Sequence, residues 1–113
     1  MSKGYPEVLE HIRDECVYLS GIPAQVGLDG FLQDENLKRA SVRSLEIIGE
    51  ASKKVPEAFR RSHPKIGWKA MAGMRDVLIH DYLGVDYNIV WDVMVNHIPP
   101  LLAAIKTVIG SKP

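Results

Sequence analysis

The fold is indicated most clearly by residues 31–55, which read FLQDENLKRASVRSLEIIGEASKKV. Small and apolar residues recur in this stretch at spacings of three and four, namely Leu37, Ala40, Ser41, Leu45, Ile48, Ala51 and Val55. Charged residues occupy the positions between them, which is the pattern of an amphipathic helix with one buried side. We therefore expect a long helix over residues 31–55, with Asp29 as its N-cap.

A second helical pattern precedes this segment, at residues 6–20. Its apolar residues also recur at spacings of three and four: Val8, Leu9, Ile12, Cys16 and Leu19. The glycines and the proline between residues 21 and 30 predict a loop before the long helix. After the long helix, residues 56–66 predict a basic connector that can hold one short turn. A third helix is then expected from about Gly67 to Leu83, where Gly84 can end it in the left-handed conformation.

A fourth helix is expected to begin with Asp86 as its cap and to run to about Ile109. The Pro99-Pro100 pair predicts a kink in it, because a proline in mid-helix lacks the backbone donor and clashes with the preceding turn. This helix is apolar on most of its sides, and in so small a domain a second copy of the chain is the simplest cover. No segment shows the alternation of a strand. The sequence thus predicts an all-α fold, an antiparallel bundle of about four helices in a single domain spanning residues 1–113.

Composition places the chain among soluble globular proteins, with 46% hydrophobic and 25% charged residues. Nothing approaches about 18 consecutive apolar residues, so no membrane-spanning helix is expected, and residues 1–10 carry no secretory signal. The single cysteine, Cys16, cannot form an internal disulfide, which favours a reducing, cytoplasmic location.

The formal net charge is zero, but the charges are unevenly distributed. Residues 38–75 contain ten basic and three acidic residues, an excess of +7, which leaves −7 for the rest of the chain. Such asymmetry favours one face that binds an anionic partner. Solvated helix faces that happen to be basic would give the same count, so charge alone leaves both interpretations open.

Residues 75–82 read RDVLIHDY and place Arg75, His80 and Tyr82 within eight positions. A guanidinium can hold a phosphate through two hydrogen bonds, and an imidazole can move a proton near neutral pH, so this trio suits phosphate chemistry. Asp76 precedes His80 by one helical turn, from where its carboxylate can orient the ring. An isolated pattern this short is also compatible with ordinary surface salt bridges at a helix end.

In one regular helix these side chains do not share a direction. At about 100° per residue, Tyr82 lies about 20° from Arg75 around the helix axis, whereas His80 lies about 140° away. Either the helix loosens near His80, or two copies of the motif face each other across a dimer axis. We favour the second arrangement, because it also covers the apolar fourth helix.

The other candidate residues have structural interpretations. His97 lies on the apolar stripe of the fourth helix and is expected to be a core histidine. Trp68 and Trp91 lie in apolar helix segments and are expected to pack in the core or an interface. None of the His, Cys and Glu spacings typical of bound metals occurs, so no metal or other cofactor is expected.

Three separated segments resemble HepT-like proteins of the HEPN superfamily. They are IGWKAMAGMRDVLIHDY at residues 66–82, RSLEIIGEA at residues 43–51, and VWDV leading into IPPLL at residues 90–93 and 98–102. The matches occur in order and cover nearly the whole chain. This makes the resemblance far more specific than the short motif alone.

The resemblance implies a helical homodimer that acts as a metal-independent endoribonuclease, with Arg75 and His80 as catalytic residues and Asp76 and Tyr82 in support. It also implies a toxin paired with a minimal nucleotidyltransferase antitoxin, which would silence the enzyme by adenylylating Tyr82. The expected RNA contacts in the matching segments are Arg43 and Lys69. One departure is Asp76, where many family members have asparagine; an acid there is electrostatically unfavourable beside a phosphate but can orient His80.

The chemistry that fits is internal transphosphorylation, in which the ribose 2′-OH attacks the adjacent phosphate. An alternative function from a different class is that of a non-catalytic helical partner. Such a protein would bind nucleotide through Arg75 and His80 and regulate a nucleotidyltransferase. RNA cleavage in EDTA that is lost on replacing either residue separates the two.

Overall fold

The computed structural model describes the backbone of residues 4–79 and 84–110, and the side chains of residues 6–74 and 84–110. The described backbone contains helices and no strands, so the predicted all-α fold class is confirmed. In chain order the elements are α1 (Gly4–Gln25), α2 (Leu28–Gln33), α3 (Glu35–Ser52), α4 (Glu57–Ser62), α5 (Trp68–Ile79), α6 (Tyr87–Asp92), the π-helical turn η1 (Val93–His97) and α7 (Ile98–Gly110).

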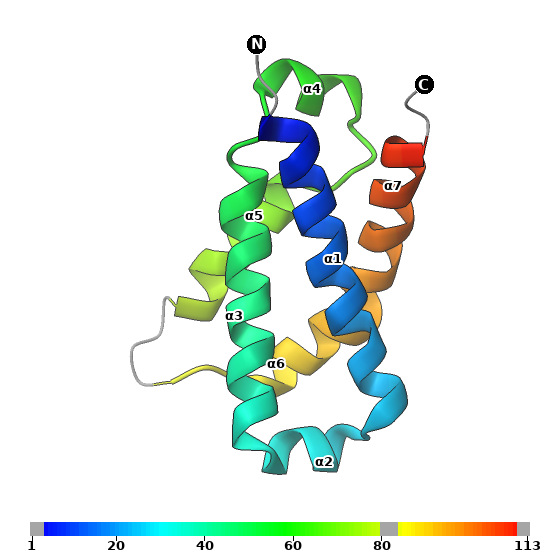
Figure 1. The fold of residues 1–113 in the computed structure, drawn as a ribbon. Coiled ribbons are helices and arrows are strands. Elements are labelled where there is room, and N and C mark those ends of the chain that lie inside the picture. Colours follow the sequence, from blue (N-terminus) through cyan, green and yellow to red (C-terminus); the bar gives the residue numbers. More distant parts are fainter. Residues whose placement is uncertain (1–3, 80–83, 111–113) are drawn as a thin grey trace.

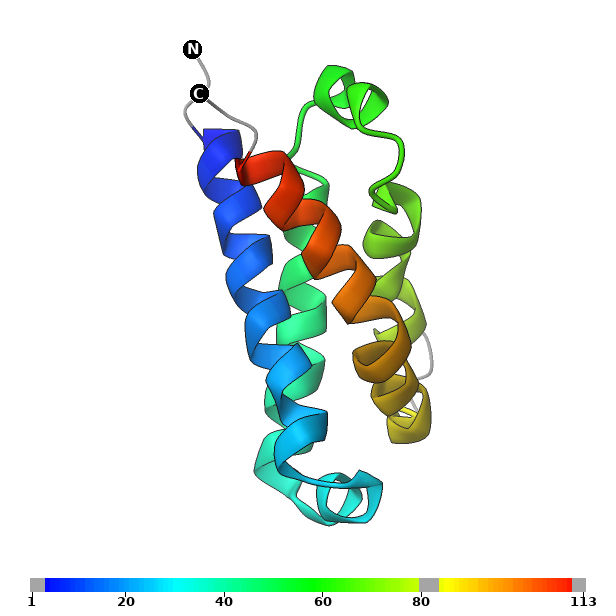
Figure 2. The same cartoon turned by 90° about the vertical axis from the view of Figure 1, so that its right-hand side faces the viewer.

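The long helices run antiparallel to their neighbours, as Figures 1 and 2 show. α3 returns beside α1, α5 packs against α3, and α7 runs back along α1. The short helix α4 crosses the end of the bundle at which α1 begins, and α2 lies at the opposite end (Figure 1). The predicted antiparallel bundle is therefore confirmed.

One hydrophobic core joins these helices. Its most deeply buried side chains come from every layer of the bundle: Leu9, Ile12 and Leu19 of α1, Phe31 of α2, Leu45 and Ile48 of α3, Met71 of α5, Val90 of α6, Met94 of η1, and Ile98 and Ile105 of α7. Full burial of one such side chain contributes about 1.5–3 kcal/mol. Packing of this strength can override local helix preferences, and it does so at several helix ends.

α1 continues through Gly21 and Pro23 to Gln25, so the loop predicted from residue 21 is wrong over this stretch. Ile22 is buried in the core, and its carbonyl accepts a hydrogen bond of 3.0 Å from the Val26 N–H. The apolar contacts of Ile22 offset the backbone hydrogen bond that Pro23 cannot donate.

The long helix begins at Glu35 rather than at Phe31, and it ends at Ser52 rather than at residue 55. Its N-cap is Asp34, whose Oδ1 accepts a hydrogen bond of 3.0 Å from the Leu37 N–H, so the assignment of Asp29 as the cap is wrong. Phe31 is buried from α2 instead. Asp29 and Asp34 offer the same capping chemistry. Because residues 28–33 form the separate helix α2, with Phe31 buried, the long helix begins after Asp34 and not after Asp29.

The start of the last helix agrees with its prediction. Asp86 caps α6 and accepts a hydrogen bond of 3.0 Å from the Asn88 N–H. The deviation expected from the two prolines takes the form of η1, where the Ile98 N–H donates to the Val93 carbonyl. Because Pro99 and Pro100 have no N–H, the carbonyls one turn earlier lack their usual donors, and a wider turn relieves this local conflict. The helical run changes direction there (Figure 1).

The π turn rotates His97 away from the apolar stripe. The buried positions of this helical run are Val90, Met94, Ile98, Leu101 and Ile105. The His97 side chain is 61% exposed, with Nε2 3.7 Å from Asp92 Oδ2. The interpretation of His97 as a core histidine is therefore wrong.

Tyr87–Gly110 forms a helical run of 24 residues that is long and apolar enough, by length and composition, to cross a membrane. Counting uninterrupted apolar residues missed it, because polar residues such as Asn88 and Asp92 interrupt the run. This is weak evidence for a membrane span, since core helices of soluble proteins meet the same criteria. One side of this run belongs to the bundle core.

The described part of α5 begins at Trp68 and reaches Ile79. Its predicted end at Leu83 lies outside the described residues. Gly84 has a positive φ, as expected, but at 149° it is more extended than the left-handed helical value of about +57°. A positive φ of this size strains any residue with a Cβ, which explains glycine at this position.

Candidate nucleic-acid interface and catalytic motif

The motif predicted to carry the chemistry begins in the second half of α5. The backbone of Arg75 and Asp76 is part of that helix. Their side chains, and the whole of His80 and Tyr82, lie outside the described residues. What the structure supplies is the helix that presents the motif and the surroundings of its first turns.

The start of α5 is tied to the end of α4. Trp68 is 8% exposed, and its Nε1 donates a hydrogen bond of 3.0 Å to the His63 carbonyl oxygen. Its indole packs edge-on against Phe59, with ring centroids 6.2 Å apart, and Phe59 stacks on the His63 ring at 4.2 Å. The expectation that Trp68 is a core residue is confirmed. These contacts make α4, the connector and the first turn of α5 one packed unit.

An open cleft of about 670 Å³ lies between α4 and the first turns of α5. Its charged lining residues are Glu57, Arg60, Arg61 and Lys69. The indole-bearing residue Trp68 lines it as well. A cleft lined by three cations and one carboxylate attracts anions.

The two residues expected to contact RNA lie apart. Lys69 lines the α4–α5 cleft, and within the described part of the chain it forms no ion pair. Arg43 lies on α3, with Nη1 3.6 Å from Glu46 Oε1. It lines a different cavity of about 280 Å³ together with His11 of α1. Lys69 can therefore bind an anion without losing an existing ion pair, whereas Arg43 already lies beside Glu46.

Reasoning from the sequence missed two residues of this cleft, Arg60 and Arg61. Both contribute to the basic excess of residues 38–75, but nothing in their spacing relates them to Lys69. The connection arises because the connector folds back and places the last turn of α4 beside the start of α5. The adjacent pair Arg60-Arg61 was the feature of the sequence that could have indicated a contact with an anion.

Residue types typical of catalytic triads meet between α1 and α3, but in a structural arrangement. Ser44 Oγ donates a hydrogen bond of 2.6 Å to Glu15 Oε1, and His11 Nε2 lies 3.4 Å from Glu15 Oε2. The carboxylate thus lies between the hydroxyl and the imidazole, whereas a triad needs the imidazole in the middle. In the part of the chain that is described, no group of three or more His, Cys, Asp or Glu side chains is arranged to hold a metal ion.

Cys16 is fully buried beside this group. Burial, followed by the nearby Glu15 carboxylate, raises the pKa of the Cys16 thiol to about 12. A thiol in this state is not a nucleophile at neutral pH, because the thiolate is the reactive form. Cys16 is therefore a core residue.

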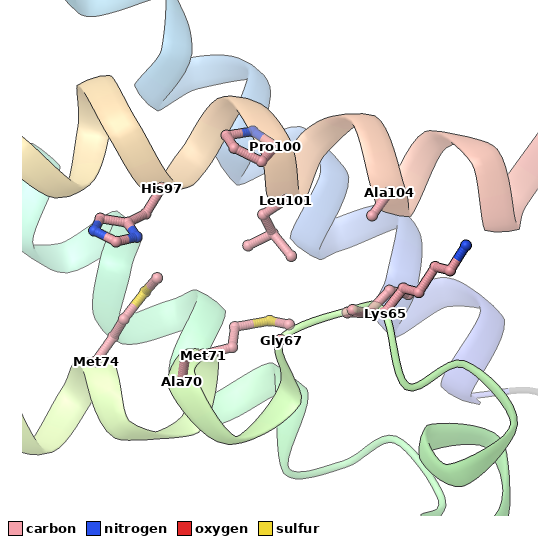
Figure 3. A pocket seen from close by; sticks show the side chains of 10 residues that line it. Lys65, Gly67, Ala70, Met71, Met74, His97, Pro100, Leu101 and Ala104 are labelled. Carbon is pink, nitrogen blue, oxygen red and sulfur yellow. The ribbon is translucent and has the colours of Figure 1, made fainter.

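A smaller cavity of about 190 Å³ lies between α5 and α7. Figure 3 shows Met71 facing Leu101 across it and Met74 pointing toward His97 at one end, with Lys65 at the other end. His97 and Lys65 are the titratable side chains of this cavity, and they lie at its opposite ends. They are therefore too far apart to act as an acid–base pair. The cavity is an apolar gap between two helices.

A helical bundle whose helix α5 contains Arg75, with a basic cleft at the start of that helix, defines a small all-α protein with a site suited to anions. The chain belongs to the HepT-like ribonuclease family, which matches residues 7–108. The resemblance to HepT-like proteins that the sequence segments indicated is thereby confirmed.

Individual relatives agree with this assignment. The chain is 48% identical over 101 residues to "Putative RNase TTE0752" of Caldanaerobacter subterraneus subsp. tengcongensis, a match that covers 89% of this chain and 90% of the relative. It is 41% identical over 101 residues to "Probable ribonuclease HepT" of Thermococcus cleftensis, which covers 89% of this chain and 92% of that protein. No solved structure matches the chain.

Proposed function

We propose that this chain is a metal-independent endoribonuclease that cleaves RNA by internal transphosphorylation. The observation that carries the proposal is the match to the HepT-like ribonuclease family over residues 7–108, a range that includes Arg75, His80 and Tyr82 of this sequence. The basic cleft on the same helix supports it, because it offers a phosphate polymer further contacts.

In the proposed reaction the ribose 2′-OH attacks the adjacent phosphorus, and the bond to the 5′-oxygen of the next nucleotide breaks. The products are a 2′,3′-cyclic phosphate and a 5′-OH. His80 takes the proton from the 2′-OH, and His80 of a second copy of the chain gives a proton to the leaving 5′-oxygen. Arg75 holds the non-bridging oxygens and stabilises the charge that builds up on them. The nucleophile is part of the substrate, so this route needs no metal to generate one.

The remaining motif residues have supporting roles in this proposal. Asp76 orients the His80 ring, and Tyr82 acts close to the reacting phosphate. Lys69 and, at a greater distance along the RNA, Arg43 contact the backbone. The enzyme acts as a homodimer, because Arg75 and His80 of one regular helix do not point at the same place.

In the cell, we place the enzyme in the cytoplasm as the toxin of a toxin–antitoxin pair. Its partner in this proposal is a minimal nucleotidyltransferase that acts as the antitoxin and adenylylates Tyr82. The support is the HepT-like family itself together with the presence of a tyrosine two residues after His80.

The test is cleavage of total RNA by the purified chain in EDTA. Arg75→Ala and His80→Ala should each lower the rate by about 10²- to 10⁴-fold, the range typical of acid–base and electrostatic catalysis. His11→Ala is the matched control, because it removes an exposed histidine of α1 and should leave the rate unchanged. A terminal 2′,3′-cyclic phosphate on the products identifies the route.

Two results would contradict the proposal. Cleavage that persists in folded His80→Ala protein would remove the catalytic assignment. Intact RNA in every sample, together with nucleotide binding that depends on Arg75 and His80, would favour the non-catalytic regulatory partner instead.

A further inference from the structure

We infer that the cleft between α4 and α5 binds a backbone phosphate of the RNA through Arg60, Arg61 and Lys69. The inference rests on the proposed function and adds Arg60 and Arg61 to the backbone contact already assigned there to Lys69. It starts from the cleft itself, which is open, has a volume of about 670 Å³ and is lined by these three cations.

None of the three cleft cations has an ion-pair partner among the described side chains. Two other cations of the basic segment, Lys38 and Arg43, do have one. Lys38 Nζ lies 2.9 Å from Glu35 Oε2 and 4.7 Å from the centre of the Tyr87 ring. Unpaired cations gain more from a phosphate than paired ones do, since no existing contact has to be given up.

Within the cleft, one acidic residue is present, Glu57. The structure gives it no ion pair with Arg60, Arg61 or Lys69, so the charged lining keeps its excess of positive charge. The net field still favours an anion.

Arg60 provides a further reason for an anionic ligand. Its side-chain Nε is buried and has no hydrogen-bond partner among the described atoms. A guanidinium that is partly withdrawn from water without an acceptor is unfavourable, and an anionic oxygen brought beside it is bound more strongly than one in bulk solvent. The planar group can offer a phosphate two parallel N–H donors.

The cleft is also built before any ligand arrives. Arg60 and Arg61 occupy the last turn of α4, and the hydrogen bond from Trp68 Nε1 to the His63 carbonyl ties that turn to α5. Lys69 follows Trp68 directly on α5. The backbone positions of the three cations are therefore fixed relative to one another, which reduces the entropy lost on binding.

The distance to the motif fits a single strand. Lys69 precedes Arg75 by six residues on α5, which is a rise of about 9 Å at about 1.5 Å per residue. One strand advances by at least about 3.4 Å per nucleotide. Lys69 and Arg75 also differ by about 120° around the helix axis, so one strand that reaches both sites would curve around α5, with the cleft phosphate a few nucleotides from the cleaved one.

The experiment measures the binding of a fluorescein-labelled single-stranded RNA with 2′-O-methyl riboses, which lacks the nucleophile and is not cleaved. Arg60→Gln/Arg61→Gln should bind it on the order of tenfold more weakly at physiological salt. The slope of log K against log salt should become shallower by at most about 0.7, because the cleft neutralises one phosphate of a single strand. On unmodified RNA, the KM should rise while kcat stays close to that of the parent.

The matched control is Arg13→Gln/Lys106→Gln, which removes the same two charges from α1 and α7 and should leave affinity and slope unchanged. If the double variant folds poorly, Arg61→Gln alone can be used, because it replaces an exposed side chain. The loss of RNA affinity should then be about half as large in free energy. Helical circular dichroism checks the fold of each variant.

The results separate this inference from the proposed function. Normal binding by folded Arg60→Gln/Arg61→Gln, with the parent cleaving RNA, overturns the cleft assignment and leaves the ribonuclease intact. Absence of cleavage by the parent overturns the ribonuclease, while RNA binding that still depends on Arg60 and Arg61 upholds the cleft. Normal RNA binding with lost binding of a protein antitoxin would assign the cleft to that protein and overturn the inference.

Discussion

The indole Nε1 of Trp68 donates a hydrogen bond of 3.0 Å to the carbonyl oxygen of His63, and this contact closes the connector between α4 and α5. His63 follows the last residue of α4, and Trp68 is the first residue of α5. A buried core residue thus sets the spacing of the two arginines of α4 from Lys69. The stability of the bundle and the shape of the basic cleft consequently depend on the same side chain.

Trp68→Phe should weaken both the fold and the cleft. The phenyl ring keeps much of the packing but cannot donate to the His63 carbonyl, so the free energy of unfolding should fall by about 1–3 kcal/mol. For a chain of this size that corresponds to a decrease in Tm of several degrees, at about 4 °C or more for each kcal/mol. The measurements are thermal unfolding and RNA affinity. Trp91→Phe, which alters a ring contact with Phe31 far from the cleft, should leave RNA affinity unchanged; equal losses of affinity in both variants would contradict the assigned role.

Cys16 should make the protein less stable in alkaline solution. Its thiol has a pKa of about 12 in the folded chain against an ordinary 9.0. Between these values the unfolded chain releases a proton that the folded chain keeps, so stability is fully present below about pH 9 and falls above it, by at most about 1.4 kcal/mol per pH unit. Urea unfolding of the parent and of Cys16→Ala checks this. The stability advantage of the parent should shrink as the pH rises above 9, and a constant difference between the two would contradict the prediction.

Tyr82 should be the regulatory residue of the proposed enzyme. A nucleotide on its hydroxyl would bring a negative phosphate close to Arg75 and compete with the RNA. Tyr82→Phe keeps the ring, so it should remain folded and nearly as active as the parent, but it removes the attachment point. Co-expression with a partner nucleotidyltransferase should rescue cells from the parent and not from the Phe variant. Equal rescue of both, or an intact mass of the parent without an added adenylyl group, would reject this mechanism.

The chain should form a dimer through its third and fourth predicted helices. The outer side of the last helical run leaves Ile89 and Val95 exposed, at 46% and 41%, and such apolar surface favours burial against a second copy. Val95→Glu should therefore raise the dimer dissociation constant by tenfold or more, because burial of one apolar side chain contributes about 1.5–3 kcal/mol and about 1.4 kcal/mol corresponds to tenfold. Sedimentation over a range of protein concentrations measures it. Val17→Glu is the control, since Val17 is 48% exposed on α1; a monomer at every concentration, or a larger effect at position 17, would refute this interface.

Several features of the fold follow from local patterns and could be predicted from the sequence. The spacing of apolar residues indicated the helices and their antiparallel order, and Asp86 was identified as a cap because its carboxylate bonds an amide only two residues away. The candidate motif was equally visible, because Arg75 and His80 are close along the chain. The helical spacing and the Asp86 cap are complete within a turn or two of helix, so tertiary context has little power to change them.

Other features were decided by packing between distant segments. Pro23 argued for a loop, yet the burial of Ile22 carries α1 past it. Identical capping chemistry at Asp29 and Asp34 could not say which of them precedes the long helix. His97 leaves the apolar stripe because η1 changes the rotation of the helix at that point.

The basic cleft shows the same division. The sequence determined that this chain has an excess of cations between residues 38 and 75, and it identified Lys69 as one that could meet RNA. Only the tertiary structure placed Arg60 and Arg61 beside it and left all three without partners among the described residues. Charge is a property of each residue, but the pairing of charges depends on which side chains the fold brings within about 4 Å of each other, and that distance is set by the packing of α4 on α5.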